Sequence, residues 1–198
     1  MAGTRMSGKK SSPEARSTDF SSVAFVFLDR DGVINRKPPD EEYVVSWEDT
    51  RILPGVERAI GLLNHASRKV IVVTNQRGIA LGFLSEPDLL SLHEKLQKHL
   101  NSLGAHLDAI YYCPHDLGQC NCRKPAPGLF EVAFRDFPEA SPGNSVMIGD
   151  SSSDILAGAR LGMKTILITE KASFCEGWTV SPSATGRSLL EVVTTYLS

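Results

Sequence analysis

A short apolar run that ends in two carboxylates constrains the fold of this chain more than any other feature. Residues 23–28 read VAFVFL, and Asp29, Arg30, Asp31 and Gly32 follow directly. A run of this length, rich in Val and Phe, is typical of a strand buried on both faces in a parallel sheet. Side chains two positions apart share one side of an extended chain, so Asp29 and Asp31 could converge on one magnesium ion and one phosphoryl group. An ordinary strand with an Asp-Gly turn is the alternative for this motif alone.

A second apolar run, residues 69–74, also ends in polar side chains. It reads KVIVVT, and Asn75 and Gln76 follow Thr74. Hydroxyl and amide groups at a strand end, together with nearby backbone N–H groups, can hold phosphate oxygens. An ordinary strand-to-loop junction with polar caps is the alternative.

Two cations stand next to a pair of prolines. Arg123 and Lys124 precede Pro125, and Pro127 follows two residues later. A residue before proline is pushed away from helical angles, so we expect the cations in an extended segment. A solvated basic pair is the alternative, since Lys and Arg are mostly exposed.

A third apolar run, residues 145–149, ends at Asp150. The sequence SSSD and a helical pattern follow, so that Asp154 lies four positions after Asp150. Taken alone, this segment could be a strand, an Asp turn and a capped helix. Together with the earlier runs it supplies a further acidic strand end.

Four metal-ligating side chains lie between residues 113 and 122. They are Cys113, His115, Cys120 and Cys122. Tetrahedral zinc takes such a set, whereas a disulfide between cysteines two apart closes awkwardly. A full set leaves no position for water, so the zinc is expected to be structural. This zinc clip, residues 113–122, runs straight into Arg123, and we expect it to direct the two cations toward phosphate.

The ordered motifs resemble those of the haloacid dehalogenase-like phosphatases over residues 23–168. The strings FLDRDGVIN, VVTNQRGIALG, YYCPHDLGQCNCRKPAPGLF and MIGDSSSDILAGARLG look like the heptose 1,7-bisphosphate phosphatase group of that family. Histidinol-phosphate phosphatases share the zinc clip and stay an alternative. The chain departs from the group at Arg77, where a small Ser is common, and at Leu81, where Arg is usual. The loop between His115 and Cys120 is also shorter.

The resemblance implies a magnesium-dependent phosphomonoester hydrolase. Asp29 is expected to form an aspartyl-phosphate, while Asp31 protonates the leaving sugar oxygen and later activates water. The Asp29 carboxylate, the Asp31 backbone carbonyl and Asp150 are expected to hold magnesium. Thr74 and Lys124 are expected to stabilise the transferring phosphoryl group.

Further residues are expected to bind substrate or to support the site. The expected substrate contacts are Asn75, Gln76, Arg77, Arg123 and Ser151. For Asp154 two roles stay open: orienting Lys124 or a metal-bound water, or starting a helix.

The alternating pattern predicts an α/β fold with a Rossmann-like parallel sheet, helices on both faces, no cap domain and a short zinc-binding loop. Right-handed crossovers would then bring every motif to the same carboxyl edge. Helices are expected near 53–66, 85–104 and 127–137, with further strands at 109–112 and 164–168. His93 and His99 are expected at the surface or its boundary, and not as ligands.

Composition agrees with an enzyme of one domain. The 198 residues are 41% hydrophobic and 22% charged, with a net charge of −2, so no overall positive field recruits nucleic acid or an anionic membrane. We expect a disordered tail over 1–21, a single domain over 22–198, and a monomer in the cytoplasm that acts on a small phosphorylated sugar. Cys175 is expected to be a free thiol.

Two other classes remain open. A polynucleotide 3′-phosphatase should show a basic groove, which this composition does not favour. A noncatalytic zinc-stapled binding module would have no reason to keep the catalytic groups.

Overall fold

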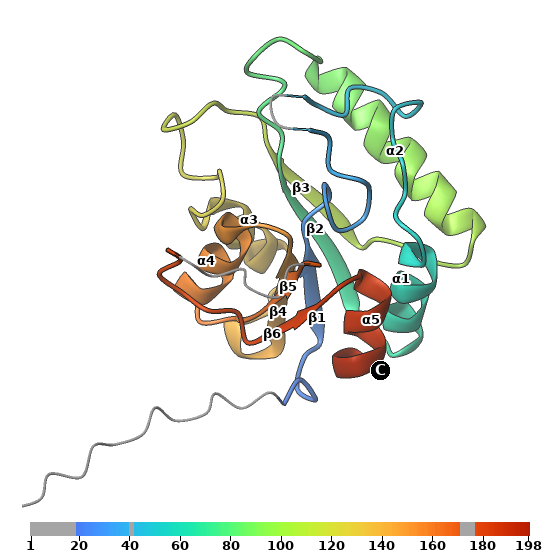
Figure 1. The fold of residues 1–198 in the computed structure, drawn as a ribbon, viewed down its shortest axis with the longest axis vertical. Coiled ribbons are helices and arrows are strands. Elements are labelled where there is room, and N and C mark those ends of the chain that lie inside the picture. The colour runs from blue at the N-terminus through green and yellow to red at the C-terminus, as the bar shows by residue number, and fades with distance from the viewer. Residues whose placement is uncertain (1–18, 40–41, 171–176) are drawn as a thin grey trace, which may run out of the picture.

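The computed structural model describes residues 19–39, 42–170 and 177–198. Its centre is a six-stranded sheet in the order β3-β2-β1-β4-β5-β6, in which all pairs are parallel (Figure 1). The strands are β1 (Phe25–Leu28), β2 (Lys69–Asn75), β3 (Ala109–Cys113), β4 (Ser145–Gly149), β5 (Lys164–Ile168) and β6 (Ala184–Gly186). The expected parallel α/β sheet is confirmed.

The pairing register places the motif residues at one edge. Leu28 pairs with Val72 of β2 and with Ile148 of β4. Asp29 therefore follows β1 near the level of Thr74, the last residue but one of β2, and of Asp150, which follows β4. Side chains from three separate parts of the sequence thus meet at the carboxyl edge of the sheet, where open α/β sheets bind ligands.

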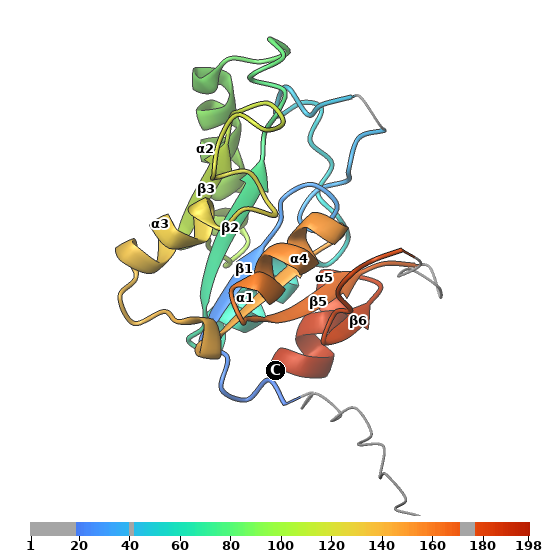
Figure 2. The ribbon, with the colours of Figure 1, turned by 90° about the vertical axis from the view of Figure 1, so that its left-hand side faces the viewer.

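Helices cover both faces of the sheet, as expected. Helices α1 (Val56–His65) and α5 (Leu189–Val192) lie on one face, and α3 (Gly128–Asp136) and α4 (Ser152–Arg160) on the other (Figure 2). The strand residues alternate accordingly.

Successive side chains of β1 illustrate this alternation. Val26 and Leu28 pack with α1 and α5, whereas Phe25 and Phe27 belong to the cluster that includes Phe130 of α3. Full burial of a side chain of this size contributes roughly 1.5–3 kcal/mol. The β1 strand is thus held from both sides.

Helix α2 (Glu86–Ser102) begins with a capping box between Ser85 and Asp88. Its buried stripe contains the expected leucines at positions 89, 92, 96 and 100. His93 is also buried, with an exposed fraction of 6%, so the expectation of a surface position is wrong for this residue. The reason is geometric, because residue 93 lies four positions after Leu89 and three before Leu96, on the same helix face.

The two ends of the described chain pack together. Phe20 is buried, and its ring lies 5.4 Å from that of Tyr196. The expected tail over 1–21 is therefore wrong at Phe20, where an aromatic side chain joins the core. Residues 1–18 of that tail and Cys175 lie outside the described residues.

Some short elements had no sequence prediction. They are β6, α5, the short helix η1 (Pro142–Asn144) and the final turn η2 (Val193–Leu197). Across the described ranges, no helix is both long enough and apolar enough to cross a membrane.

Candidate active site

A pocket of about 340 Å³ opens at the carboxyl edge of the sheet. Its lining comes from the ends of β1, β2 and β4, from the loop after β1, and from the segment that follows the zinc clip. All the expected catalytic and substrate-binding residues except Lys124 line it, namely Asp29, Asp31, Thr74, Asn75, Gln76, Arg77, Arg123 and Ser151, together with Asp150.

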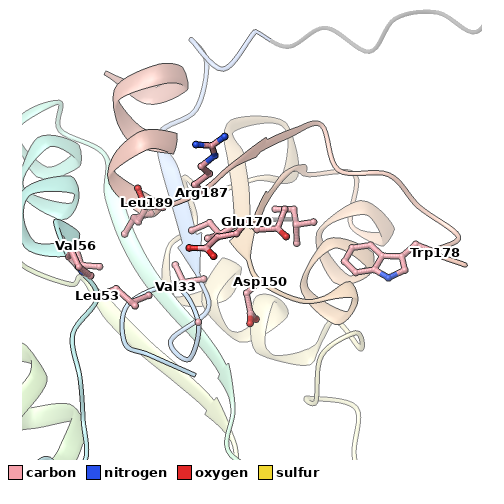
Figure 3. Close-up of a pocket in the computed structure, with 14 residues that line it drawn as sticks. Val33, Leu53, Val56, Asp150, Glu170, Trp178, Arg187 and Leu189 are labelled. Atoms are coloured by element: carbon pink, nitrogen blue, oxygen red, sulfur yellow. The ribbon is translucent and has the colours of Figure 1, made fainter. Parts of the chain in front are cut away.

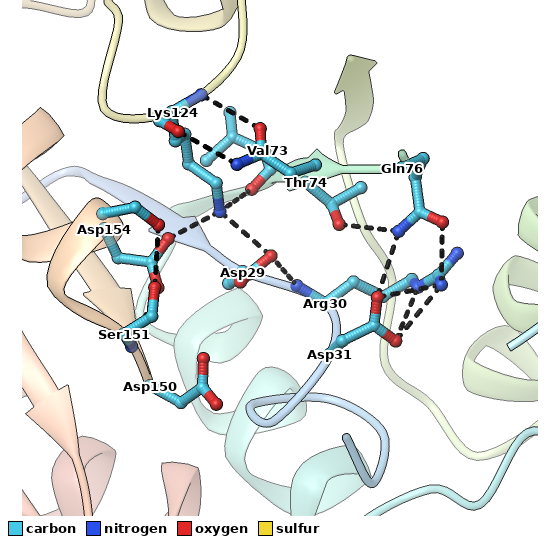
Figure 4. Close-up of polar contacts among 12 residues, drawn as sticks. Asp29, Arg30, Asp31, Val73, Thr74, Gln76, Lys124, Asp150, Ser151 and Asp154 are labelled. Atoms are coloured by element: carbon cyan, nitrogen blue, oxygen red, sulfur yellow. Dashed lines mark hydrogen bonds and ion pairs between the residues drawn. The ribbon is translucent and has the colours of Figure 1, made fainter. Parts of the chain in front are cut away.

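Lys124 lies beneath this pocket and joins two carboxylates. Its buried Nζ lies 3.0 Å from Asp29 Oδ1 and 2.7 Å from Asp154 Oδ1 (Figure 4). It also donates a hydrogen bond of 2.7 Å to the Val73 carbonyl. Burial acts to lower the pKa of Lys124, but Asp154 and Asp29 outweigh it and raise that pKa. The amine is therefore a fixed positive charge.

The surroundings of Asp29 disfavour the ionised form of its carboxylate. Burial raises the pKa of Asp29 to about 7, against the opposing effect of Lys124. Neighbouring Asp154 adds to the rise. A positive charge beyond that of Lys124 would favour the ionised form, which is the form that can attack phosphorus.

Asp31 has a contrasting environment. Arg30 Nη2 donates to both of its carboxylate oxygens at 3.1 and 3.0 Å, Asn35 donates at 2.8 Å, and Gln76 Nε2 donates at 3.0 Å. Burial acts to raise the pKa of Asp31, but Arg30 and these hydrogen bonds outweigh it and hold the pKa below its ordinary value. The side chain is fully engaged, which leaves the expected backbone carbonyl as its group for a metal.

Two predicted substrate contacts also serve the site internally. The Asn75 side chain bonds both backbone groups of Lys124, donating to the carbonyl at 3.1 Å and accepting from N at 3.0 Å. Gln76 links Asp31 to Thr74, whose Oγ1 accepts from Nε2 at 2.9 Å. Their binding of substrate stays a prediction.

The segment that carries the cations differs from the expected extended form. Ala126 N donates to the Arg123 carbonyl at 2.8 Å, so the chain turns there. This turn, held by Asn75, brings Lys124 under the pocket. Arg123 Nη1 is buried and has no hydrogen-bond partner among the described residues.

Gly32 allows the Asp150 carboxylate to approach the backbone of the turn after β1. Its φ is +89°, and a Cβ there would lie 2.4 Å from Asp150 Oδ2. Any side chain at this position would strain the backbone and displace the carboxylate. The glycine that ends the first motif is therefore required by the close approach of the third.

The acidic side chains at this edge fit a magnesium ion. Oxygen atoms of Asp29, Asp150 and Asp154 lie within 4.8 Å of one another. Asp150 Oδ1 is buried without a hydrogen-bond partner in the described structure, and burial raises the pKa of Asp150. Carboxylate oxygens are the ligands that magnesium prefers.

Two further groups lie around this cluster: Asp154, for which two roles were open, and Lys37, which no sequence motif contains. Asp154 joins it, and also accepts from Ser151 Oγ at 2.6 Å and from Ser151 N at 3.1 Å at the start of α4. The structure thus combines its two suggested roles, next to Lys124 and at a helix start. Lys37, on the loop after β1, lies with Nζ 2.8 Å from Asp150 Oδ2. Lys37 was not predicted as a site residue because it lies in an irregular loop, outside the sequence motifs.

The four expected zinc ligands also gather. The donor atoms of Cys113, His115, Cys120 and Cys122 lie within 4.8 Å of one another. The closest sulfur pair, Cys113 and Cys122, is 3.1 Å apart, well beyond a disulfide bond of about 2.05 Å. All three cysteines are free. Three thiols and one imidazole in this arrangement suit a closed zinc site.

Loop contacts close the pocket on the side of the clip. Arg77 Nε lies 2.5 Å from Asp116 Oδ1, which ties the loop after β2 to the clip. Tyr43 stacks on Phe83 with ring centroids 5.1 Å apart. These two contacts connect the loop after β2 to the clip and to the loop after β1.

A larger cavity of about 920 Å³ adjoins Asp150 on its other side (Figure 3). Its labelled lining combines the apolar side chains of Val33, Leu53, Val56 and Leu189 with the charged side chains of Arg187 and Glu170. Because it contains neither Asp29 nor Asp31, size does not identify it as the phosphate site. The smaller pocket holds the converging chemistry.

Comparisons with known proteins agree with this geometry. A HAD-hydrolase-like family model matches residues 121–183. The D-glycero-alpha-D-manno-heptose-1,7-bisphosphate 7-phosphatase of Mycobacterium bovis is 43% identical over 66% of this chain and 68% of its own length. The D-glycero-beta-D-manno-heptose-1,7-bisphosphate 7-phosphatase of Haemophilus ducreyi is 40% identical over 77% of this chain and 87% of its own.

A solved structure shows the same similarity in three dimensions. The D,D-heptose 1,7-bisphosphate phosphatase from B. bronchiseptica, complexed with magnesium and phosphate, superposes with a TM-score of 0.79 and 30% identity. The match covers 87% of this chain and 97% of that one. The chain therefore belongs to the HAD-like phosphatases, in the family of these heptose-bisphosphate phosphatases.

Proposed function

We propose that this phosphatase removes the 7-phosphate of D-glycero-D-manno-heptose 1,7-bisphosphate and requires magnesium. The observation that carries the proposal is the position of Asp29, whose side chain is 13% exposed and lies beside Lys124, within a cluster of carboxylates that suits a divalent cation. Relatives from M. bovis and H. ducreyi, named as 7-phosphatases, support the position of the phosphate. Histidinol phosphate and a polynucleotide 3′-phosphate are the alternative substrates to be tested.

The Asp29 carboxylate would begin the reaction. An Asp29 oxygen forms a bond to phosphorus while the bond from phosphorus to the sugar oxygen breaks. Lys124 holds the attacking carboxylate in place, and Thr74 and Lys124 stabilise the phosphoryl oxygens. Magnesium held by Asp29, Asp150 and the Asp31 carbonyl would supply the positive charge that lets an anion approach phosphate.

Asp31 would handle the protons. It gives a proton to the leaving sugar oxygen, then takes one from the water that attacks the aspartyl-phosphate and releases Asp29. Arg30 favours the ionised carboxylate in the free site. An anionic phosphate beside Asp31 acts in the opposite direction and favours the protonated form.

The test measures phosphate release from a panel of substrates with magnesium present. The panel contains both anomers of heptose 1,7-bisphosphate, histidinol phosphate, fructose 1,6-bisphosphate and a 3′-phosphorylated oligonucleotide. We expect the highest kcat/KM with a heptose bisphosphate and a heptose 1-phosphate as product. Since relatives are named for either anomer, the panel also assigns the anomer. A higher kcat/KM for histidinol phosphate or the oligonucleotide would overturn the proposal.

We further propose that the clip holds structural zinc and positions Arg123. The support is the closed set of four donors next to the turn that carries the cations. Thiolate ligation also favours a reducing compartment such as the cytoplasm. Cys120→Ser should lower zinc content, thermal stability and activity together, whereas the control Cys175→Ser should change none of them. Full activity in a zinc-free protein would refute this role.

A further inference from the structure

His93 is the buried titratable group for which the proposed reaction has no use. It lies on α2, far in sequence from the motifs, and its Nε2 is 3.2 Å from Nη1 of Arg30. The Tyr112 ring packs against it with centroids 5.8 Å apart. Burial, and then the positive charge of Arg30, lower the pKa of His93 to about 3, against the weaker opposing effect of Asp31. The imidazole is therefore neutral, and Nε2 can accept the hydrogen bond from Arg30.

Arg30 requires such an acceptor. Its side chain is 1% exposed, and a guanidinium carries five N–H donors. Nη2 faces Asp31 and also donates to Gln76 Oε1 at 3.1 Å, while Nε lies 3.4 Å from Asp31 Oδ1. His93 is the partner that the structure gives to Nη1. Without it, a buried charged group would lack a hydrogen bond, so the guanidinium would have to move toward water or another acceptor.

Helix α2 can act as a rigid support for this contact. It runs over 17 residues, starts with a complete capping box, and buries Leu89 and Leu96 on either side of His93. The contact thus connects a helix packed in the core to the side chains of Asp31, Gln76 and Thr74 through one guanidinium.

We propose that His93 is a positioning residue for the phosphatase reaction, acting through Arg30 to hold Asp31 in line with the leaving oxygen. This inference rests on the proposed role of Asp31 as proton donor. It predicts a defect that depends on the leaving group. A sugar oxygen needs a proton to leave, whereas p-nitrophenolate leaves without one.

The experiment compares kcat/KM for heptose bisphosphate and p-nitrophenyl phosphate, because this parameter reports the steps through departure of the leaving group. The variants are His93→Leu, which removes the acceptor, and His93→Gln, which keeps one. His99→Leu is the matched control, because His99 lies on the same helix but is partly exposed and faces Glu57 and Trp47. Asp31→Asn tests the underlying role.

For His93→Leu we expect kcat/KM for the sugar substrate to fall at least tenfold more than that for p-nitrophenyl phosphate. His93→Gln should restore most of the difference, and His99→Leu should show none. If Asp31→Asn lacks the selective defect, the proton-donor role fails. If Asp31→Asn shows it but His93→Leu does not, the inference about His93 fails. Should the Leu variant not fold, His93→Met repeats the test, since a thioether accepts hydrogen bonds only weakly.

Discussion

Two carboxylates of one motif, only two residues apart, lie in opposite electrostatic surroundings. In the Asp29 half of the site, three carboxylates from Asp29, Asp150 and Asp154 gather, and the buried ammonium group of Lys124 contacts Asp29 and Asp154. In the Asp31 half, a single carboxylate is matched by the Arg30 guanidinium and by neutral donors from Asn35 and Gln76. The pKa of Asp29 is raised to about 7, and that of Asp31 is lowered.

The protein supplies its own counter-charge in the Asp31 half and leaves this task to a ligand in the Asp29 half. The Asp31 half is complete without a metal, because each carboxylate oxygen has donors. The Asp29 half holds more negative charge than Lys124 can neutralise, and Lys37 at its rim is half-exposed. A divalent cation would correct this imbalance, so the demand for metal belongs to one half of the motif only.

The largest effect is expected at Asp29, the proposed nucleophile. Asp29→Asn should reduce turnover more than about a thousandfold, since removal of a nucleophile eliminates the covalent route. Without metal, Asp29→Asn should unfold at a temperature no lower than that of the parent protein. Burial disfavours the ionised Asp29 carboxylate, and the substitution removes that charge. Phosphate release and thermal unfolding check the two statements. Activity near the parental value would show that Asp29 does not attack phosphorus.

Loss of Lys124 should be the next most severe change. Lys124→Met leaves Asp29 and Asp154 buried without their cation, and breaking a buried pair costs about 3–5 kcal/mol. The control is Lys69→Met, at an ion pair of 2.8 Å with Asp108 whose lysine is 47% exposed. The Lys69 ammonium group is half in water, and Asp108, which is 8% exposed, keeps a hydrogen bond from Val70 N, so loss of this pair should cost less than loss of the buried one. Urea unfolding compares them, and equal losses would contradict the assigned burial energetics.

Magnesium should stabilise the protein through the Asp29 half. At a concentration one hundred times Kd, binding to the folded state raises the free energy of unfolding by about 2.7 kcal/mol. Asp150→Asn should abolish most of this gain, whereas Asp31→Asn should preserve it, because that side chain is engaged elsewhere. Thermal unfolding with and without magnesium distinguishes them. If both variants lost the magnesium-dependent stabilisation equally, the need for metal would not be confined to the Asp29 half.

The smallest expected effect near neutral pH concerns acid stability in the Asp31 half, because it develops only as the pH falls below 6.5. Because the pKa of His93 falls from 6.5 to about 3 on folding, the unfolded state binds more protons between these values. The contribution of His93 is therefore present above pH 6.5 and is lost as pH falls toward 3, by up to about 1.4 kcal/mol per pH unit. His93→Gln should lack this component in urea titrations at several pH values. An unchanged slope would mean that His93 is already protonated in the fold.

Much of the site could be predicted because strand ends are readable in a sequence. Asp29, Thr74 and Asp150 each follow an apolar run, and parallel strands bring such ends to one edge. The four Cys and His side chains of the proposed zinc site could be predicted to gather from residue type and spacing. The burial of His93 was not predicted, although this residue lies in the leucine stripe of its helix. The polarity of histidine favoured a surface position, whereas its place in the helix decided its burial.

Other features depended on neighbours that are distant in the chain. Phe20 joins the core only because Tyr196 lies beside it. The turn at Arg123 depends on Asn75, and the engagement of Gln76 depends on Arg30.

The sequence by itself determined the parallel sheet and the edge at which the proposed reacting groups gather, since these follow from local patterns of apolar runs and their polar ends. Only the tertiary structure decided how the charges are divided between Asp29 and Asp31. The physical reason is that burial and hydrogen bonding, which govern the energy of a charge, arise from residues brought together across the whole fold.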